Sequence, residues 1–131
     1  MPEGDTIFRA ARTLRRALAG RVVTRFDAVY PRLTRIAEDH PIVGRTIDDV
    51  RAAGKHLLMV LSGDLVLRSH LKMNGRWHIY RPGEPWQRPF SSMRVVIATN
   101  EFVAVAFDIT DVDFHTTSGL ARDSAVGTLG P

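Results

Sequence analysis

A chain of 131 residues is long enough for one domain. Its 44% hydrophobic residues are enough for a buried core, which excludes an intrinsically disordered chain. The lack of cysteine excludes disulfides and thiolate metal sites within these residues, and the longest apolar run, Phe102–Phe107, is too short to span a bilayer. Because the formal net charge is +4 and no secretory signal pattern is present, we expect a soluble, intracellular protein with an anionic partner.

The positive charge is concentrated in the middle of the chain. Residues 1–50 carry nine basic and seven acidic side chains, residues 51–90 carry seven and two, and residues 91–131 carry two and five, which gives net charges of +2, +5 and −3. Arginine supplies 16 of the 18 basic residues, and its planar fork of donors suits phosphate, although a bias toward arginine codons would give the same composition. We therefore expect the anionic partner to bind near the middle segment.

The segment from Ile7 to Leu18 is predicted to be a helix. Its apolar residues recur at spacings of four, three and four: Ile7, Ala11, Leu14 and Leu18. Asp5 or Thr6 can cap its start, and Gly20 stands where a helix stop is expected. The opposite face carries arginines that we interpret as a solvated surface: Arg9, Arg12 and Arg16.

From residue 21 onward the pattern changes to short strands separated by turns. Six runs are strand candidates: 24–30, 57–61, 65–71, 76–80, 94–99 and 102–107. Residues 81–92 contain three prolines and are predicted to be a loop. Short strands joined by hairpin-like turns favour a sandwich or barrel. We predict an α+β fold that is mainly β, an antiparallel β-sandwich with an N-terminal helix and a short C-terminal helical segment.

The tail from Ser118 to Pro131 is poor in large apolar residues and has the composition of a linker. We therefore predict that residues 1–125 form one domain and that residues 126–131 begin a linker to a second domain that is absent from this sequence. A frayed natural terminus is the alternative.

Pro2 and Glu3 are the most specific candidates for catalytic residues. Removal of Met1 would give Pro2 a free secondary amine, and because an α-amino group titrates near about pH 8, part of it is neutral at neutral pH. A neutral amine can attack an electrophilic carbon and form a Schiff base, and Glu3 beside it is a ready acid or base. Taken alone, Met-Pro-Glu also starts many proteins by chance.

Two further segments place basic groups at turns. Lys55 follows Gly54 in a predicted tight turn, from which it can reach a phosphate or a reacting centre. The alternative is an ordinary turn lysine. In residues 69–77, basic groups surround Met73 at an Asn74-Gly75 turn. Proteins that kink DNA insert apolar wedges such as Met between base steps, whereas the alternative is a hairpin whose Met packs in the core.

Together and in this order, these segments resemble the formamidopyrimidine-DNA glycosylase and endonuclease VIII family of bifunctional base-excision enzymes. The resemblance rests on Met1-Pro2-Glu3-Gly4 and on residues 51–58 and 69–77, and Leu129-Gly130-Pro131 is similar to the family's entry to its helix–two-turn–helix domain. It implies the N-terminal catalytic domain of a DNA glycosylase with abasic-site (AP) lyase activity, which excises oxidised bases and cleaves the strand by elimination.

The resemblance also implies roles for single residues. Pro2 would attack C1′ of the damaged nucleotide, Glu3 would protonate the sugar ring oxygen, and Lys55 would be the second catalytic lysine, which meets phosphate near the lesion. The implied DNA-binding residues are a phosphate contact and a group that fills the space left by the flipped nucleotide: His70, and Lys72, Met73 and Asn74.

The implied partner is damaged double-stranded DNA, bound by a monomer in the bacterial cytoplasm at the nucleoid, with no membrane involved. No cofactor is expected in this domain; the finger of the family's second domain, which is absent from this sequence, is usually a zinc site, and this sequence leaves open whether zinc is held there. The purine-specific branch carries an Asp-Pro-Arg-Arg-Phe loop, whereas the matching stretch here, Asp108–Phe114, has no arginine. This difference favours the endonuclease VIII branch.

Two alternatives remain open from the residues alone. A tautomerase-like enzyme also uses an N-terminal proline, but there the proline acts as a base and begins a strand, whereas a helix is expected here. A non-catalytic DNA-binding sandwich would share the basic middle segment without exposing Pro2.

Overall fold

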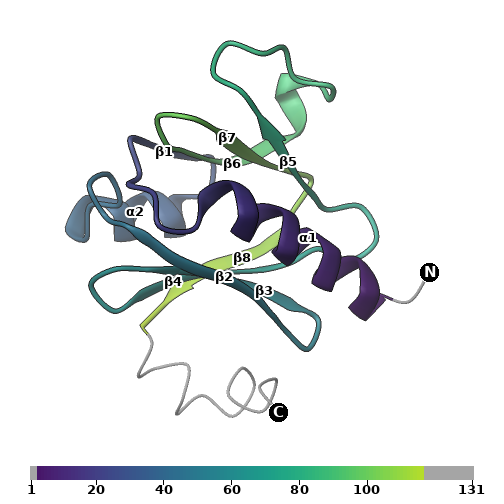
Figure 1. The fold of residues 1–131 in the computed structure, drawn as a ribbon, viewed down its shortest axis with the longest axis horizontal. Helices are drawn as coiled ribbons and strands as arrows, with labels where there is room; N and C mark the ends of the chain where they lie inside the picture. The colour runs from purple at the N-terminus through teal and green to yellow at the C-terminus, as the bar shows by residue number, and fades with distance from the viewer. Residues whose placement is uncertain (1–2, 117–131) are drawn as a thin grey trace.

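The computed structural model describes the backbone of residues 3–116, in which eight strands and two α-helices follow one another as shown in Figure 1. Side chains are described from residue 6 onward. The elements are α1 (Glu3–Leu18), β1 (Arg25–Ala28), α2 (Pro31–Asp39), β2 (Ile47–Ala53), β3 (His56–Leu61), β4 (Leu65–His70), β5 (Arg76–Tyr80), the 3-10 helix η1 (Phe90–Ser92), β6 (Met93–Ala98), β7 (Val103–Phe107) and β8 (Asp111–His115).

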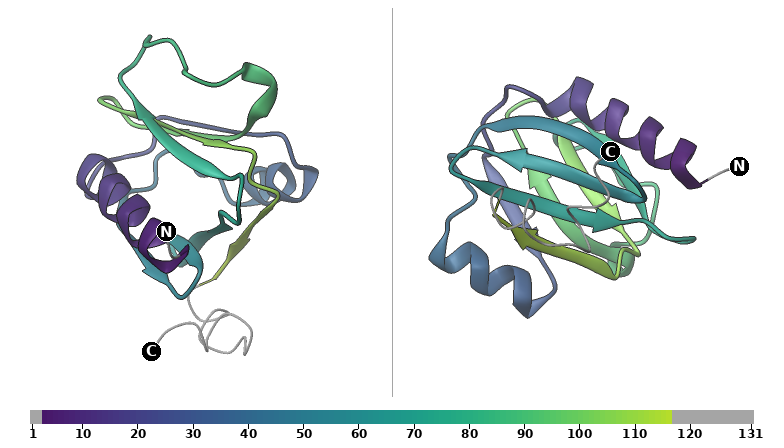
Figure 2. Two further views of the ribbon diagram at one scale, coloured as in Figure 1. Left: turned by 90° about the vertical axis from the view of Figure 1, so that its right-hand side faces the viewer. Right: turned by 90° about the horizontal axis from the view of Figure 1, so that it is seen from below.

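The strands form two four-stranded sheets that face each other. The strand orders are β1-β6-β7-β5 and β2-β3-β4-β8, and every pair is antiparallel. Figure 2 shows the two layers, with α1 along one open side and α2 on the opposite side. The predicted antiparallel sandwich with an N-terminal helix is therefore confirmed, while the predicted C-terminal helical segment and linker lie outside the described residues.

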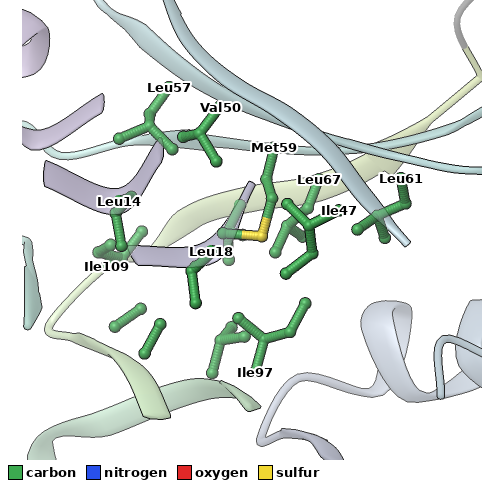
Figure 3. Close-up of a cluster of buried hydrophobic side chains, with 14 of the residues drawn as sticks. Leu14, Leu18, Ile47, Val50, Leu57, Met59, Leu61, Leu67, Ile97 and Ile109 are labelled. Atoms are coloured by element: carbon green, nitrogen blue, oxygen red, sulfur yellow. The ribbon is translucent and has the colours of Figure 1, made fainter. Parts of the chain in front are cut away.

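The core lies between the sheets and against the inner face of α1 (Figure 3). Met59, Leu67 and Ile97 are fully buried there. A second cluster around Phe107 covers the outer face of the β1-β6-β7-β5 sheet, with Trp86 of the 81–92 loop packed on it. Since β6 and β7 are buried on both faces, their sequences are nearly continuous apolar runs rather than alternating ones.

Helix α1 lies along β2 with the periodicity that the sequence predicts. Its apolar face is buried, and Arg15 Nη1 donates a hydrogen bond of 2.9 Å to the carbonyl oxygen of Val50. The backbone of Gly20, at φ +83°, ends the helix and donates to the Ile47 carbonyl at 2.7 Å. The start of α1 is thereby directed toward the far end of β2, at Ala53. Of the helices that the structure describes, none has the length and apolar character needed to cross a membrane.

Besides the short 3-10 helix η1, which lies in the predicted loop 81–92, three elements were not predicted. Pro31 was expected to end a strand, but it begins α2, where its fixed φ suits the first turn and its missing N–H is no loss. Strand β2 carries an irregular register between Ile47 and Asp49, which interrupts its alternation. The stretch Asp108–Phe114 was matched to a loop, but most of it belongs to strand β8, because Asp111 and Asp113 form ion pairs with Arg68 on the neighbouring strand β4.

Gly75 fixes the loop that follows β4. Its N–H donates to the Leu71 carbonyl at 2.9 Å, and a Cβ placed on it would lie 2.5 Å from that same oxygen and 2.8 Å from Cγ1 of Ile109. Real Cβ atoms do not approach backbone so closely, so any larger residue must push the loop away from the sandwich.

We expect Gly75→Ala to lower the free energy of unfolding by about 2–3 kcal/mol, because the added methyl group meets backbone on a packed surface. Gly83→Ala is the matched control. Gly83 has φ +83° with nothing within 4 Å of its Cβ position, so only backbone strain of about 1 kcal/mol applies. Urea unfolding of both variants measures the difference, and equal losses would contradict the steric argument.

Candidate active site

The start of α1 and the loop after β4 enclose a hollow of about 450 Å³. It is lined by Thr6, Ile7, His70, Leu71, Lys72, Met73 and Arg76. The structure thus brings together three of the sequence-predicted site residues, His70, Lys72 and Met73, at the first turn of the helix. That helix begins at Glu3, whose side chain is not described, and Pro2 lies outside the described residues.

Lys55 lies at the same end of the sandwich. It occupies the turn between β2 and β3, where Gly54 adopts φ +60°, and the pairing of Ala53 with His56 makes this a tight turn. His56 pairs in turn with His70, so the Lys55 turn and the C-terminal end of β4 lie at the same end of the sheet. Lys55 is exposed and is not among the residues that line the hollow.

The loop at residues 71–75 presents Met73 to solvent. Met73 is 87% exposed, which rules out the core-packed alternative, and its neighbours Lys72 and Asn74 are exposed too. Leu71 is buried and Gly75 is packed, so both ends of the loop are anchored. Lys72 adopts φ +55°, a left-handed conformation that costs a non-glycine residue about 1–2 kcal/mol. The fold therefore holds an apolar tip in water on a strained but well-anchored loop.

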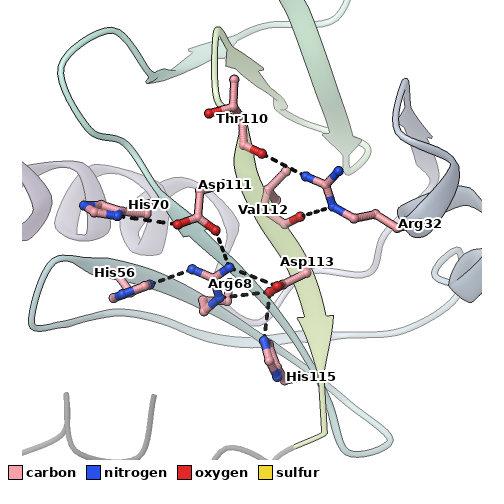
Figure 4. Close-up of polar contacts among 9 residues, drawn as sticks. All are labelled: Arg32, His56, Arg68, His70, Thr110, Asp111, Val112, Asp113 and His115. Atoms are coloured by element: carbon pink, nitrogen blue, oxygen red, sulfur yellow. Dashed lines mark hydrogen bonds and ion pairs between the residues drawn. The ribbon is translucent and has the colours of Figure 1, made fainter. Parts of the chain in front are cut away.

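A buried arginine on the outer face of the β2-β3-β4-β8 sheet organises this end of the sandwich (Figure 4). Arg68 is 5% exposed. Its Nε and Nη2 donate to both carboxylate oxygens of Asp113 at 2.9 and 3.0 Å, and Nη2 donates to Asp111 at 2.6 Å. Its Nη1 lies 2.7 Å from Nδ1 of His56, so that nitrogen must be the unprotonated acceptor. The register that pairs Arg68 with Asp113 places all these groups on one face.

The titration of this network follows from its contacts. The hydrogen bond from Arg68 holds the pKa of Asp111 below its ordinary value in spite of partial burial. Burial would lower the pKa of Arg68, but hydrogen bonds to Asp113 and Asp111 raise it. Burial, followed by the charge of Arg68, lowers the pKa of His56. At neutral pH the network therefore holds the Arg68 guanidinium, an ionised Asp111 and a neutral His56.

The same network positions His70. Nδ1 of His70 lies 3.6 Å from Oδ2 of Asp111, and its ring centroid lies 5.0 Å from that of His56. The carboxylate of Asp111 thus bridges Arg68 and His70, the residue predicted to contact phosphate. Sequence reasoning missed Arg68 because an alternating strand allows a charged outer position. The available signal was the pair Asp111 and Asp113, whose i, i+2 spacing puts two carboxylates on one strand face.

Two residues near the start of α2 hold the segment that leads into β8. Arg32 donates from Nη2 to the Thr110 carbonyl at 2.8 Å and from Nε to the Val112 carbonyl at 3.0 Å. The hydroxyl of Tyr30 donates to the Ile109 carbonyl at 2.8 Å. These contacts were not predicted, and they fix the segment beside Gly75 from the side opposite α1. In the part of the chain that the structure describes, no three His, Asp or Glu side chains are grouped to hold a metal ion.

Comparison with known proteins gives consistent matches. The family model for the formamidopyrimidine-DNA glycosylase N-terminal domain matches residues 1–116. The chain is 43% identical over 132 residues to the probable endonuclease 8 2 of Streptomyces coelicolor, covering 100% of this chain and 46% of that protein. It is 37% identical over 131 residues to the DNA-(apurinic or apyrimidinic site) lyase Nei2 of Mycolicibacterium smegmatis, covering 100% of this chain and 48% of that protein.

The solved structures agree on the fold. The LlFpg protein in a complex with a THF-DNA and an inhibitor superposes with a TM-score of 0.76 at 20% identity, over 89% of this chain and 44% of that one. MutM in complex with DNA containing carbocyclic 8-oxo-G gives 0.75 at 20% identity, over 89% and 46%. The chain spans about half the length of the curated relatives it matches.

We expect the stability of the wild-type protein to fall as the pH drops from about 7 to about 5, partly through His56. Its pKa is lowered in the folded state, so the unfolded chain binds a proton first, near its ordinary pKa of 6.5, and unfolding is favoured below that pH. His56→Asn keeps an acceptor for Arg68 and removes the titration, so its stability should fall less steeply. Urea unfolding across this pH range measures the slopes.

The exposed residue His40 at the end of α2 supplies the control variant, His40→Asn. Its slope should stay closer to that of the wild type than the slope of His56→Asn does. Identical slopes for His56→Asn and wild type would contradict the assignment of a neutral, desolvated His56.

Proposed function

The chain belongs to the formamidopyrimidine-DNA glycosylase family as its N-terminal domain, and from this membership we propose that the protein is a bifunctional DNA glycosylase and AP lyase of the endonuclease VIII branch. Its substrate is damaged double-stranded DNA carrying an oxidised base. The branch assignment is supported by the names of the curated relatives, endonuclease 8 and AP lyase, and by the sequence of Asp108–Phe114, which lacks arginine.

One observation carries the proposal: the first turn of α1, the exposed Met73 loop and the Lys55 turn meet at one end of the sandwich. Pro2 immediately precedes α1 in the sequence, and Thr6 and Ile7 of that helix line the hollow. A nucleotide turned out of the duplex needs such a recess next to the attacking group. The start of α1 as a helix also argues against the tautomerase alternative, in which the proline begins a strand.

The proposed chemistry uses residues of this chain alone. The amine of Pro2 attacks C1′, and the glycosidic bond breaks with its electron pair going to the departing base, which takes up the proton that the amine loses. Glu3 protonates the ring oxygen as the C1′–O4′ bond opens, which leaves an iminium between Pro2 and C1′. The iminium acidifies the C2′ protons, and loss of one of them expels the 3′ phosphate and breaks the strand. Lys55 and His70 bind phosphates beside the lesion, which keeps C1′ near the amine.

Met73 fills the space that the everted nucleotide leaves in the duplex. An exposed thioether side chain forgoes burial that would stabilise the protein by roughly 1.5–3 kcal/mol, so insertion between base pairs recovers that free energy on the DNA. Lys72 and Asn74 flank it and supply a charge and an amide at the strand edges.

We also propose that residues 1–125 constitute the catalytic domain and that residues 126–131 begin the connection to a second, DNA-binding domain. The relatives' roughly twofold greater length supports this division. The protein works as a monomer on the bacterial chromosome in the cytoplasm, consistent with the bacterial origin of these relatives.

Borohydride trapping tests the proposed nucleophile. We expect the full-length protein, with Met1 removed, to form a covalent adduct with abasic-site DNA, because hydride reduces the iminium to a stable amine. Pro2→Gly should lower the adduct yield by about tenfold or more, since the reacting secondary amine is lost. Denaturing electrophoresis measures the adduct, and intact mass establishes that Met1 is gone. An undiminished adduct in Pro2→Gly, or none in the wild type, would contradict the proposal.

Met73→Ala tests the wedge. We expect it to reduce excision from a duplex by about 10- to 100-fold, because the gap left by the everted nucleotide then stays open. Cleavage of an abasic site in a single strand, which has no stack to hold open, should change by less than about twofold. Single-turnover rates on both substrates give the comparison, and equal losses would indicate a structural role for Met73 instead.

A further inference from the structure

A second hollow, of about 540 Å³, lies on the other side of Met73 and contains a cluster of arginines that the proposed chemistry does not use. It is lined by Met73, Asn74, Arg76, Arg88, Arg94, Asp108 and Thr110. Met73 and Arg76 line both hollows, so they form the partition between the one at the start of α1 and this one.

The three guanidinium groups come from three separate segments and are each held in place. Nη1 of Arg76 donates to the Gly75 carbonyl at 2.6 Å, and Nη1 of Arg94 donates to the Ser91 carbonyl at 2.9 Å. Nη1 of Arg88 donates to Asp108 at 3.3 Å. These contacts engage one nitrogen of each group, whereas an arginine carries five N–H donors.

The lining carries an excess of positive charge. Three arginines face one carboxylate, that of Asp108, among the lining residues. The same positive charge acts on His78 of strand β5. The pKa of His78 is lowered by burial and then by the charges of Arg88 and Arg76. A recess with excess guanidinium charge and fixed forks is suited to phosphate, which accepts two parallel N–H bonds from an arginine.

We propose that this hollow binds the phosphodiester backbone of the DNA strand opposite the lesion. The inference rests on the proposed function and extends it to the second strand. If Met73 occupies the gap in the duplex, the everted nucleotide goes to the hollow beside α1, and the strand that stays stacked lies beyond the partition. The arginine hollow lies on the same side of the partition as that strand, so its guanidinium groups can bind the phosphates of the complementary strand.

The test compares two variants of the full-length protein that remove equal charge. Arg88→Gln combined with Arg94→Gln empties the hollow of two guanidinium groups, while Arg25→Gln combined with Arg35→Gln removes two exposed arginines on β1 and α2. The probes are a duplex carrying one tetrahydrofuran abasic analogue and the lesion strand alone, each titrated by fluorescence anisotropy at several salt concentrations.

We expect the hollow variant to bind the duplex about tenfold more weakly and to lower the salt slope by about 1–2, the value for one or two lost phosphate contacts. Its affinity for the lesion strand alone should change by less than about twofold, and the control should match the wild type on both probes within the same margin. A duplex affinity no lower than that of the control would overturn the proposal. Equal losses on duplex and single strand would overturn the assignment to the opposite strand.

Methylphosphonate linkages provide a measurement on the wild-type protein, which does not depend on how the variants fold, and a second measurement on the hollow variant. Neutral linkages scanned through the complementary strand around the position opposite the lesion should weaken binding of the wild-type protein by a similar factor, with no further loss in the hollow variant. Full additivity of the two changes would overturn the contact. A wild-type protein that fails to bind the abasic duplex at all would refute the proposed function itself, which a failure of the arginine hollow alone would leave intact.

Discussion

The burial of one guanidinium determines how the working end of this sandwich is built. Arg68 is 5% exposed, and a charge taken from water costs several kcal/mol unless partners replace the solvent. Asp111 and Asp113 supply that compensation from β8, and the requirement fixes both the pairing of β8 with β4 and its register. His56 can then only accept from Arg68, and His70 lies beside Asp111, so the end of the sheet that faces the α1 hollow is ordered by this one charge.

This dependence explains which parts of the fold could be read from the sequence. Helix α1 and strands β3 to β7 carry their own patterns, since periodicity and apolar runs are local signals. Strand β8 has aspartates at two of its five positions, and Asp is depleted in strands, so its structure comes from a partner 45 residues earlier in the chain. Helix α2 was missed for a different reason: Pro31 is equally compatible with the end of a strand and with the first turn of a helix.

The candidate site also has one part that could be predicted from local sequence and one part that could not. The loop around Met73 was predictable because an Asn-Gly turn is a local signal, and its exposure follows from Gly75, whose lack of a side chain lets the loop close on Leu71 and Ile109. The arginine hollow was not predictable, because Arg76 and Arg94 are brought together by the pairing of β5 and β6 with β7, and Arg88 reaches them from the loop between β5 and β6. A local motif could place the exposed Met73, whereas the arginines on its far side depend on the assembled sheet.

The net charge of the chain also takes a different meaning in the folded protein. The last third carries −3, which in sequence looks unfavourable for an anionic partner. Within residues 91–116, which the structure describes, its four carboxylates are instead paired with arginines from earlier segments: Glu101 with Arg21, Asp108 with Arg88, and Asp111 and Asp113 with Arg68. These acidic groups neutralise structural cations rather than forming an acidic surface that repels phosphate. Lys72 and Arg76, by contrast, place positive charge in the lining of the hollow beside Met73, where the proposed DNA backbone would approach.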